Sequence, residues 1–202
     1  MREVRDALLT WRRLELHQTI EETGSAPFPA CTSVLDPFEA PWTTELIVDC
    51  GDWTAYLNNA IDGGDPTAAA PYLGKRLECE CIVAIHAPPH GPGHASTQLW
   101  MQGPDGEPPN MGVRTIAAHA EDGRWTWHTS GPLQSFEQPA RYTARRKRDR
   151  LDRPLLVGYL DALGIRVDDE AFYGEGLGFR QIVDYKRRRE TLEQVRARFG
   201  WS

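Results

Sequence analysis

Five residues whose side chains bind metals lie close together in the middle of the chain. A C-x-C pair is followed by histidines spaced H-x3-H-x3-H, and the set consists of Cys79, Cys81, His86, His90 and His94. Zinc and copper accept thiolate and imidazole ligands of this kind. On a strand, however, His86 would point away from the two cysteines, because successive side chains alternate between faces. The alternative is a pair of buried strand cysteines followed by solvated loop histidines, and we predict no cofactor.

A pair of histidines is the second candidate for chemistry. If Ala117 lies opposite His128 in a β-hairpin, the imidazoles of His119 and His128 are diagonal neighbours on one polar face. Two imidazoles placed in this way can share a ligand and act as acid and base near neutral pH. The simpler alternative is two exposed strand histidines. The sequence contains no nucleophile elbow, P-loop, dinucleotide-binding fingerprint or zinc-protease motif that would favour an enzyme.

Two runs of basic residues form the third candidate. The first contains Arg141, Arg145, Arg146, Lys147 and Arg148, and the second contains Lys186, Arg187 and Arg188. Clustered cations of this kind bind phosphates or acidic protein surfaces. If both runs are helical, ion pairs at i, i+4 account for much of the charge instead. Those pairs would be Arg145 with Asp149, Arg148 with Asp152, and Arg189 with Glu193. No nucleic-acid motif accompanies the runs, so a protein partner is favoured over nucleic acid.

The charge is distributed unevenly along the chain. The 202 residues carry a net charge of −6, but residues 141–202 contain 15 Lys or Arg against 10 Asp or Glu, a net +5. The totals of 23 basic and 29 acidic residues leave 8 and 19 for residues 1–140, a net −11. We therefore expect an acidic α+β sheet region, 1–140, and a basic helical segment, 141–202, within a single domain.

The clearest structural signal is a β-hairpin over residues 113–130. Asp122-Gly123 is flanked by alternating residues, as a type I′ turn requires. Counting outward from the turn gives the opposed pairs Glu121 with Arg124, Ala120 with Trp125, His119 with Thr126, and Ala118 with Trp127. The face that carries the two tryptophans must be buried, and the face that carries the histidines can stay wet.

The remaining elements are predicted from hydrophobic spacing and from helix-start residues. Strands are expected over 42–50, 78–85 and 97–102, and helices over 2–22, 65–77, 140–152, 154–163 and 179–199. Residues 53–61 fit either a strand or a helix, and we favour the strand. The glycine-rich residues 174–178 are interpreted as a flexible link, because no strand precedes them.

The last predicted helix carries a narrow apolar stripe flanked by charge. Its members are Ile182, Tyr185, Leu192, Val195 and Phe199. Such a stripe packs on its own domain or, alternatively, on a second copy or a partner groove.

Together these elements predict an α+β protein with a mostly antiparallel sheet of five to six strands, on which an N-terminal helix and a basic C-terminal helical segment pack. No stretch approaches the roughly 20 apolar residues of a membrane span, and we predict a cytoplasmic protein. The favoured function is a non-enzymatic binding or adaptor role of the regulatory or immunity type, with another protein as the partner. The alternatives are a small enzyme with a site on the polar face of the sheet, and a nucleic-acid-binding protein that uses the basic helices.

Overall fold

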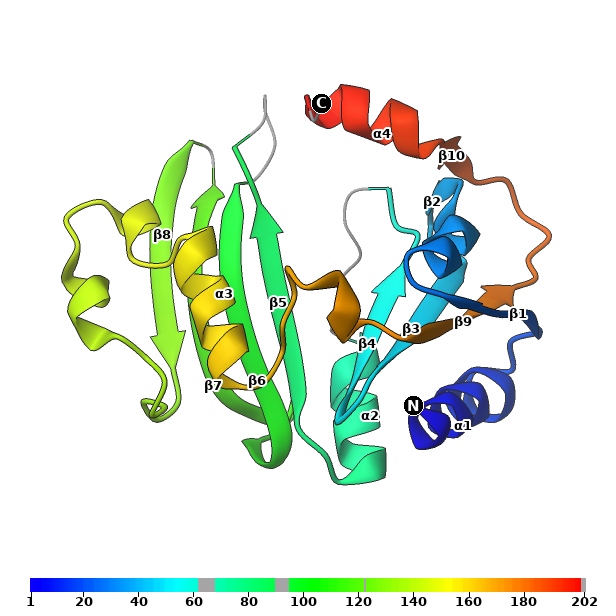
Figure 1. Ribbon diagram of the computed structural model, residues 1–202, viewed down its shortest axis with the longest axis horizontal. Coiled ribbons are helices and arrows are strands. Elements are labelled where there is room, and N and C mark those ends of the chain that lie inside the picture. Colours follow the sequence, from blue (N-terminus) through cyan, green and yellow to red (C-terminus); the bar gives the residue numbers. More distant parts are fainter. Residues whose placement is uncertain (62–67, 90–94, 122, 201–202) are drawn as a thin grey trace. The chain divides into compact units, whose positions relative to one another are not determined.

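The chain folds into two compact units (Figure 1). The computed structural model describes residues 1–61, 68–89, 95–121 and 123–200. Unit 1 combines Met1–Ala69 with Asp169–Ser202, and unit 2 is the intervening stretch Ala70–Asp168. The units therefore divide the chain at 69/70 and 168/169, whereas the charge changes after residue 140. Both units combine helices with antiparallel sheet, which confirms the predicted α+β class.

Unit 1 is built on a four-stranded antiparallel sheet of order β1-β9-β3-β4, beside a two-stranded ribbon of β2 and β10. Its strands are β1 (Ile20–Pro27), β2 (Phe38–Ala40), β3 (Thr44–Cys50), β4 (Trp53–Asn58), β9 (Glu175–Gln181) and β10 (Arg188–Glu190), and its helices are α1 (Arg2–Thr10) and α4 (Leu192–Phe199). In β3, three consecutive residues, Leu46, Ile47 and Val48, are fully buried. Because successive side chains point to opposite faces, both faces of this strand are covered.

The glycine-rich stretch of unit 1 is a strand and not the flexible link that we expected. Gly176 lies in β9, between β1 and β3. A Cβ atom built on Gly176 would lie 2.6 Å from Cys31 Sγ and 3.0 Å from Leu46 Cδ1. The absence of a side chain therefore lets the 3-10 helix Ala30–Leu35 pack closely against the sheet.

We expect Gly176→Ala to lower the free energy of unfolding by about 1–3 kcal/mol, because the added methyl group overpacks a closed contact. Gly158→Ala is the matched control, since Gly158 lies in a helix and its Cβ would meet nothing within 4 Å. That change should raise stability by up to about 1 kcal/mol. Urea denaturation of both variants measures the difference, and equal stability would contradict the close packing.

A buried ion pair joins the π-helical turn Trp11–Glu15, which follows α1, to the sheet of unit 1. The guanidinium of Arg12 donates from Nη2 to Glu45 Oε1 at 2.6 Å and from Nε to Glu45 Oε2 at 3.2 Å. Tyr56 donates its hydroxyl to the same Oε1 at 2.5 Å. Arg12 also lies over the rings of Trp11 and Trp42, with its Cζ 4.1 and 5.1 Å from their centroids. Burial, with the nearby Glu45 carboxylate, raises the pKa of Tyr56 well above its usual value, so the phenol stays protonated.

Unit 2 is built on a second four-stranded antiparallel sheet, of order β5-β6-β7-β8. Its strands are β5 (Cys81–Ala87), β6 (Ser96–Glu107), β7 (Gly112–Glu121) and β8 (Arg124–Ser130), and its helices are α2 (Ala69–Leu77) and α3 (Arg153–Ala162). Helix α3 lies across one face of this sheet (Figure 1). The core between them contains Leu99, Ile116, Ala118, Leu151, Leu155, Leu156, Tyr159 and Leu160. Two four-stranded sheets thus replace the predicted single sheet of five to six strands.

The predicted hairpin is confirmed in its register. Glu121 pairs with Arg124 and Ala117 pairs with His128, and every pair between them follows the predicted count. Trp125 and Trp127 pack against the core under α3. Asp122 lies outside the described residues.

Several other predicted elements are confirmed. The strands over 42–50, 53–61, 78–85 and 97–102 correspond to β3, β4, β5 and β6, with ends shifted by a few residues. The helix over 65–77 ends at Leu77 as predicted, although its expected start at Asp65-Pro66 lies outside the described residues. The helix over 154–163 is α3, and Asp152 caps it by accepting a hydrogen bond from the Leu155 N–H at 3.0 Å.

Three predicted helices are wrong in extent or kind. The first helix ends at Thr10, passes through a π-helical turn to Glu15 and is followed by β1 instead of continuing to residue 22. Residues 140–152 form short 3-10 turns, because side chains of this stretch bond to loop carbonyls and to neighbouring carboxylates. The helix over 179–199 is reduced to α4, since β9 and β10 take its first half into sheets. No helix in the described part of the chain is long and apolar enough to cross a membrane.

Candidate functional site

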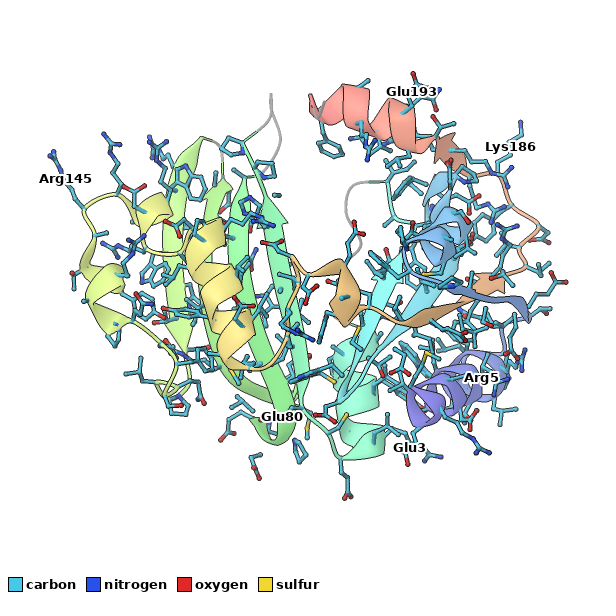
Figure 2. The ribbon with its side chains drawn as sticks, in the orientation of Figure 1. Glu3, Arg5, Glu80, Arg145, Lys186 and Glu193 are labelled. Atoms are coloured by element: carbon cyan, nitrogen blue, oxygen red, sulfur yellow. The ribbon has the colours of Figure 1, made fainter. Side chains whose placement is uncertain are left out.

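The best candidate for a functional surface is a short basic loop in unit 2. Its four cations are Arg145, Arg146, Lys147 and Arg148, which we call the basic loop, and all four are exposed. The loop follows the 3-10 turn Pro139–Thr143 and enters the 3-10 turn Lys147–Asp149. Arg145 extends away from the fold into solvent (Figure 2).

The backbone of this loop is held by bonds from both sides. Arg150 donates from Nε to the Ala144 carbonyl oxygen at 2.9 Å. Arg141 donates to the Asp149 carbonyl oxygen at 3.2 Å and to Asp152 Oδ2 at 2.8 Å. Leu151, three residues after the loop, is fully buried in the core of unit 2. These bonds present the four cations on an ordered backbone, which reduces the entropy lost when a partner binds.

A buried polar network holds the 3-10 turn Pro139–Thr143 that precedes the loop. Arg114 on β7 forms a bidentate pair with Glu137, with Nε–Oε1 and Nη2–Oε2 distances of 2.8 and 2.7 Å. Tyr142, in the 3-10 turn Pro139–Thr143, donates its hydroxyl to Glu137 Oε2 at 2.6 Å. The same hydroxyl lies 3.0 Å from that of Tyr159. The remaining Nη1 of Arg114 donates to the carbonyl oxygens of Ser130 and Gly131. The network therefore fixes residues 137–142, which precede the loop, to the sheet and to α3.

The pKa shifts in this network indicate that Glu137 and Tyr142 have a structural role. Burial alone would raise the pKa of Glu137, but hydrogen bonds from Arg114, Tyr142 and the Gln134 N–H lower it overall. Burial and the bond to Glu137 raise the pKa of Tyr142. The carboxylate is thus fully charged and the phenol fully protonated at neutral pH. With each of these groups already bonded, neither is free to transfer a proton to a ligand.

The cations of the basic loop are largely unneutralised. Arg145, Arg146 and Lys147 form no ion pair with any residue that the structure describes, and Arg148 reaches Asp149 at 3.6 Å. The predicted i, i+4 pairs Arg145 with Asp149 and Arg148 with Asp152 are wrong, because the segment is not α-helical. Asp152 binds Arg141 instead. The loop therefore carries positive charge that a partner can neutralise.

The second basic run lies in unit 1 and is partly neutralised by its own fold. Glu39, which is buried, receives Arg187 Nη1 at 3.2 Å and Arg189 Nε at 2.8 Å. Arg189 thus pairs with Glu39 and not with the predicted Glu193. Arg188 lies 3.3 Å from Glu190. Lys186 extends into solvent (Figure 2) and is exposed.

The two hairpin histidines share a polar face as predicted, but no hydrogen bond joins them. His119 Nε2 lies 2.8 Å from Thr126 Oγ1, and among the described residues its buried Nδ1 has no hydrogen-bond partner. His128 is exposed. The contacts of His119 and His128 therefore do not favour a reaction in which the two imidazoles act together as acid and base.

The Cys/His cluster is divided between the faces of β5. Cys81 pairs with Gln102 and His86 pairs with Thr97, five positions apart on the same strand, so their side chains point to opposite faces. Burial, with Cys79 close by, raises the pKa of Cys81 to about 12, which keeps this thiol protonated at neutral pH. The described residues contain no group of three or more His, Cys, Asp or Glu side chains that could hold a metal. His90 and His94 lie outside the described residues.

The apolar stripe predicted for the last helix is split. Val195 lies buried on α4, whereas Ile182 and Tyr185 lie in the connection between β9 and β10 and are about half exposed, at 46% and 49%. These two residues, with Leu16, line a shallow open groove of about 530 Å³ within unit 1. The stripe is therefore not one continuous helix face.

Comparison with known proteins gives no relative. The chain matches no protein-family model, and no curated protein or solved structure is significantly similar to it.

Proposed function

We propose that this is a binding protein that docks onto an acidic surface of another protein through the basic loop of unit 2. The observation that supports the proposal is the loop itself, in which four exposed cations stand on an anchored backbone and three of them have no ion pair among the described residues. Long cationic side chains held in this way give electrostatic complementarity and fast association with an acidic partner.

An acidic protein is a better partner for this loop than nucleic acid. The aromatic rings nearest the loop are engaged inside the fold, since Trp127 packs on Tyr142 with ring centroids 5.0 Å apart and Arg150 lies over the same indole. They do not form the free stacking platform that single-stranded nucleic acids use.

Charge reversal of the loop tests the proposal. Wild-type protein should be retained on immobilised poly-L-glutamate at low salt and released as the salt concentration rises. The variant Arg145→Glu/Arg146→Glu/Lys147→Glu should bind at least about tenfold more weakly, because three exposed pairs at about 0.2–1 kcal/mol each are lost and replaced by repulsion. Retention is measured against salt concentration on the same column.

The control has the same change in net charge at a different place. Lys75→Glu/Arg76→Glu/Lys186→Glu alters three exposed cations outside the loop and should bind like wild type. Equal losses in the two variants would mean that net charge and not the loop decides binding. Stronger retention of wild type on double-stranded DNA than on poly-L-glutamate would overturn the acidic-protein partner in favour of nucleic acid.

A further inference from the structure

One edge of the unit 2 sheet ends at the strand that the basic loop contacts. Strand β8 is the last strand in the order β5-β6-β7-β8 (Figure 1). Its register with β7 runs from Arg124 to Ser130 without a shift, and it contains no proline. An edge strand of this kind offers a row of backbone groups to an additional strand.

The hydrogen bonds of β7 show which backbone groups of β8 face outward. The Ala120 N–H donates to the Ala95 carbonyl oxygen at 2.7 Å, on the side away from β8. Ala120 and its partner Trp125 are therefore a non-hydrogen-bonded pair, and the N–H and C=O of Trp125 point away from β7. The same alternation applies to Trp127 and Thr129. None of these outward groups has a hydrogen-bond partner among the described residues.

The edge of the unit 1 sheet at β1 is protected, in contrast. Gly24 has a positive φ of 86°, and the register of β1 with β9 shifts between Glu22 and Ser25. Pro27 ends the strand and has no N–H to offer. Bulges, prolines and charges are the usual means of preventing edge pairing, and β8 has neither a bulge nor a proline.

The charges near the edge of β8 indicate what kind of strand could pair with it. Arg124 is exposed at the start of the strand, and the 3-10 turn Lys147–Asp149 of the basic loop lies against β8. Two acidic residues lie close by: Glu121 is opposite Arg124 in the hairpin register, and Asp149 Oδ1 lies 3.6 Å from Arg148 Nε. Among the described residues, the cations without an ion pair are therefore Arg145, Arg146 and Lys147 of the basic loop. A second copy of β8 would bring the same cations together, which disfavours self-pairing. An acidic segment would neutralise them.

We propose that β8 receives an extended acidic segment of a partner protein as a fifth strand of this sheet, with the basic loop neutralising the segment's carboxylates. The inference rests on the proposed function and specifies the partner's conformation. Main-chain hydrogen bonds to the outward N–H and C=O groups of Trp125, Trp127 and Thr129 add affinity to that supplied by the charges. Side chains on one face of the added strand meet the loop, so acidic residues are needed at alternate positions.

The test uses a capped peptide of alternating glutamate and valine and two N-methylated versions of it. In one version the backbone nitrogens of the glutamates are methylated, and in the other those of the valines. The alternating pattern fixes which face carries the carboxylates, because a slip of one residue would move them all to the other face. The N–H groups of alternate residues in the added strand point at β8, so methylation removes these N–H groups in only one of the two versions. We expect the two versions to differ in Kd by at least about tenfold, since two or three backbone bonds worth about 0.5–1.5 kcal/mol each are lost.

Two measurements on the protein complete the test. Binding of the unmethylated peptide should slow amide exchange at Trp125, Trp127 and Thr129, which NMR resolves residue by residue. Thr129→Pro should weaken peptide binding because it removes an outward N–H without removing a bond to β7, whereas Thr129→Ala should bind normally. Far-UV circular dichroism checks that both variants are folded.

Each outcome separates this inference from the proposed function. Equal affinity of both N-methylated peptides, with loss of binding in the loop triple variant, would overturn strand addition and leave charge docking intact. Failure of wild type to bind either the peptides or poly-L-glutamate would overturn both. Concentration-dependent dimerisation that Thr129→Pro abolishes would assign the edge to a second copy of the chain and would also overturn the inference.

Discussion

Glu137→Ala is expected to lower the free energy of unfolding of unit 2 by about 3–5 kcal/mol, because it leaves the Arg114 guanidinium buried without its counter-ion. The side chains of Arg114 and Glu137 are 6% and 0% exposed, so water cannot replace the lost carboxylate. The phenol of Tyr142 loses its acceptor in the same variant. Amide hydrogen exchange of β6 and β7, followed at increasing urea concentrations, measures the loss within unit 2.

Asp168→Asn is the control for this prediction. It removes an exposed ion pair with Arg153, in which both side chains are about half exposed, and should cost no more than about 1 kcal/mol. The pH dependence gives a second check. The folded pKa of Glu137 is lowered, so its stabilisation is complete above the unfolded value of about 4.3 and is lost as the pH falls through the folded value. The alanine variant should lose less stability in acid than wild type, and an equal acid loss would contradict the assigned pair.

Glu45→Ala should have an effect of similar size in unit 1, again about 3–5 kcal/mol, because Arg12 and Tyr56 lose the carboxylate that they share. Hydrogen exchange in β3 and β4 is the measurement, since both strands carry residues of this cluster or pair directly with them. Arg5→Ala, which removes exposed pairs with Asp6 and Glu22, should cost no more than about 1 kcal/mol.

A double replacement distinguishes lost charge pairing from lost packing at this site. In Arg12→Met/Glu45→Leu no charge is left buried, and apolar side chains fill most of the volume. The double variant should recover most of the stability that Glu45→Ala loses, as has been found for other buried pairs. If it is as unstable as Glu45→Ala, the packing of Arg12 between Trp11 and Trp42 is the main contribution instead.

The parts of the fold that could be predicted are those specified by neighbouring residues. The hairpin follows from Asp122-Gly123 and a strict alternation, and α3 follows from the cap at Asp152 and the proline after it. The strand β9 could not be found in this way. Its partners, β1 and β3, lie far away in the sequence, and its glycines resemble a linker unless the close contact with Cys31 is known.

Clustering in the sequence indicates which basic residues make up the candidate site but not the structure that holds them. The basic residues 145–148 were identified from clustering alone, whereas the helix expected for them does not form. The supporting network was missed, although a signal existed: Arg114 has the same parity as Ile116 and Ala118, which places it on the inward face of the hairpin. Its partner Glu137 lies in a segment without periodicity, so nothing local indicated that the two would meet.

The interleaved arrangement of the two units has a consequence for how the protein is made. Unit 2 is one continuous stretch, and all of its strands are synthesised before residue 169 is added. The sheet of unit 1 is different, because β9 lies between β1 and β3 and is synthesised long after both. Until then β1 and β3 lack the strand that joins them, with their apolar residues exposed. The inserted unit can therefore fold without later segments of the chain, while the unit that surrounds it must wait until β9 has been synthesised.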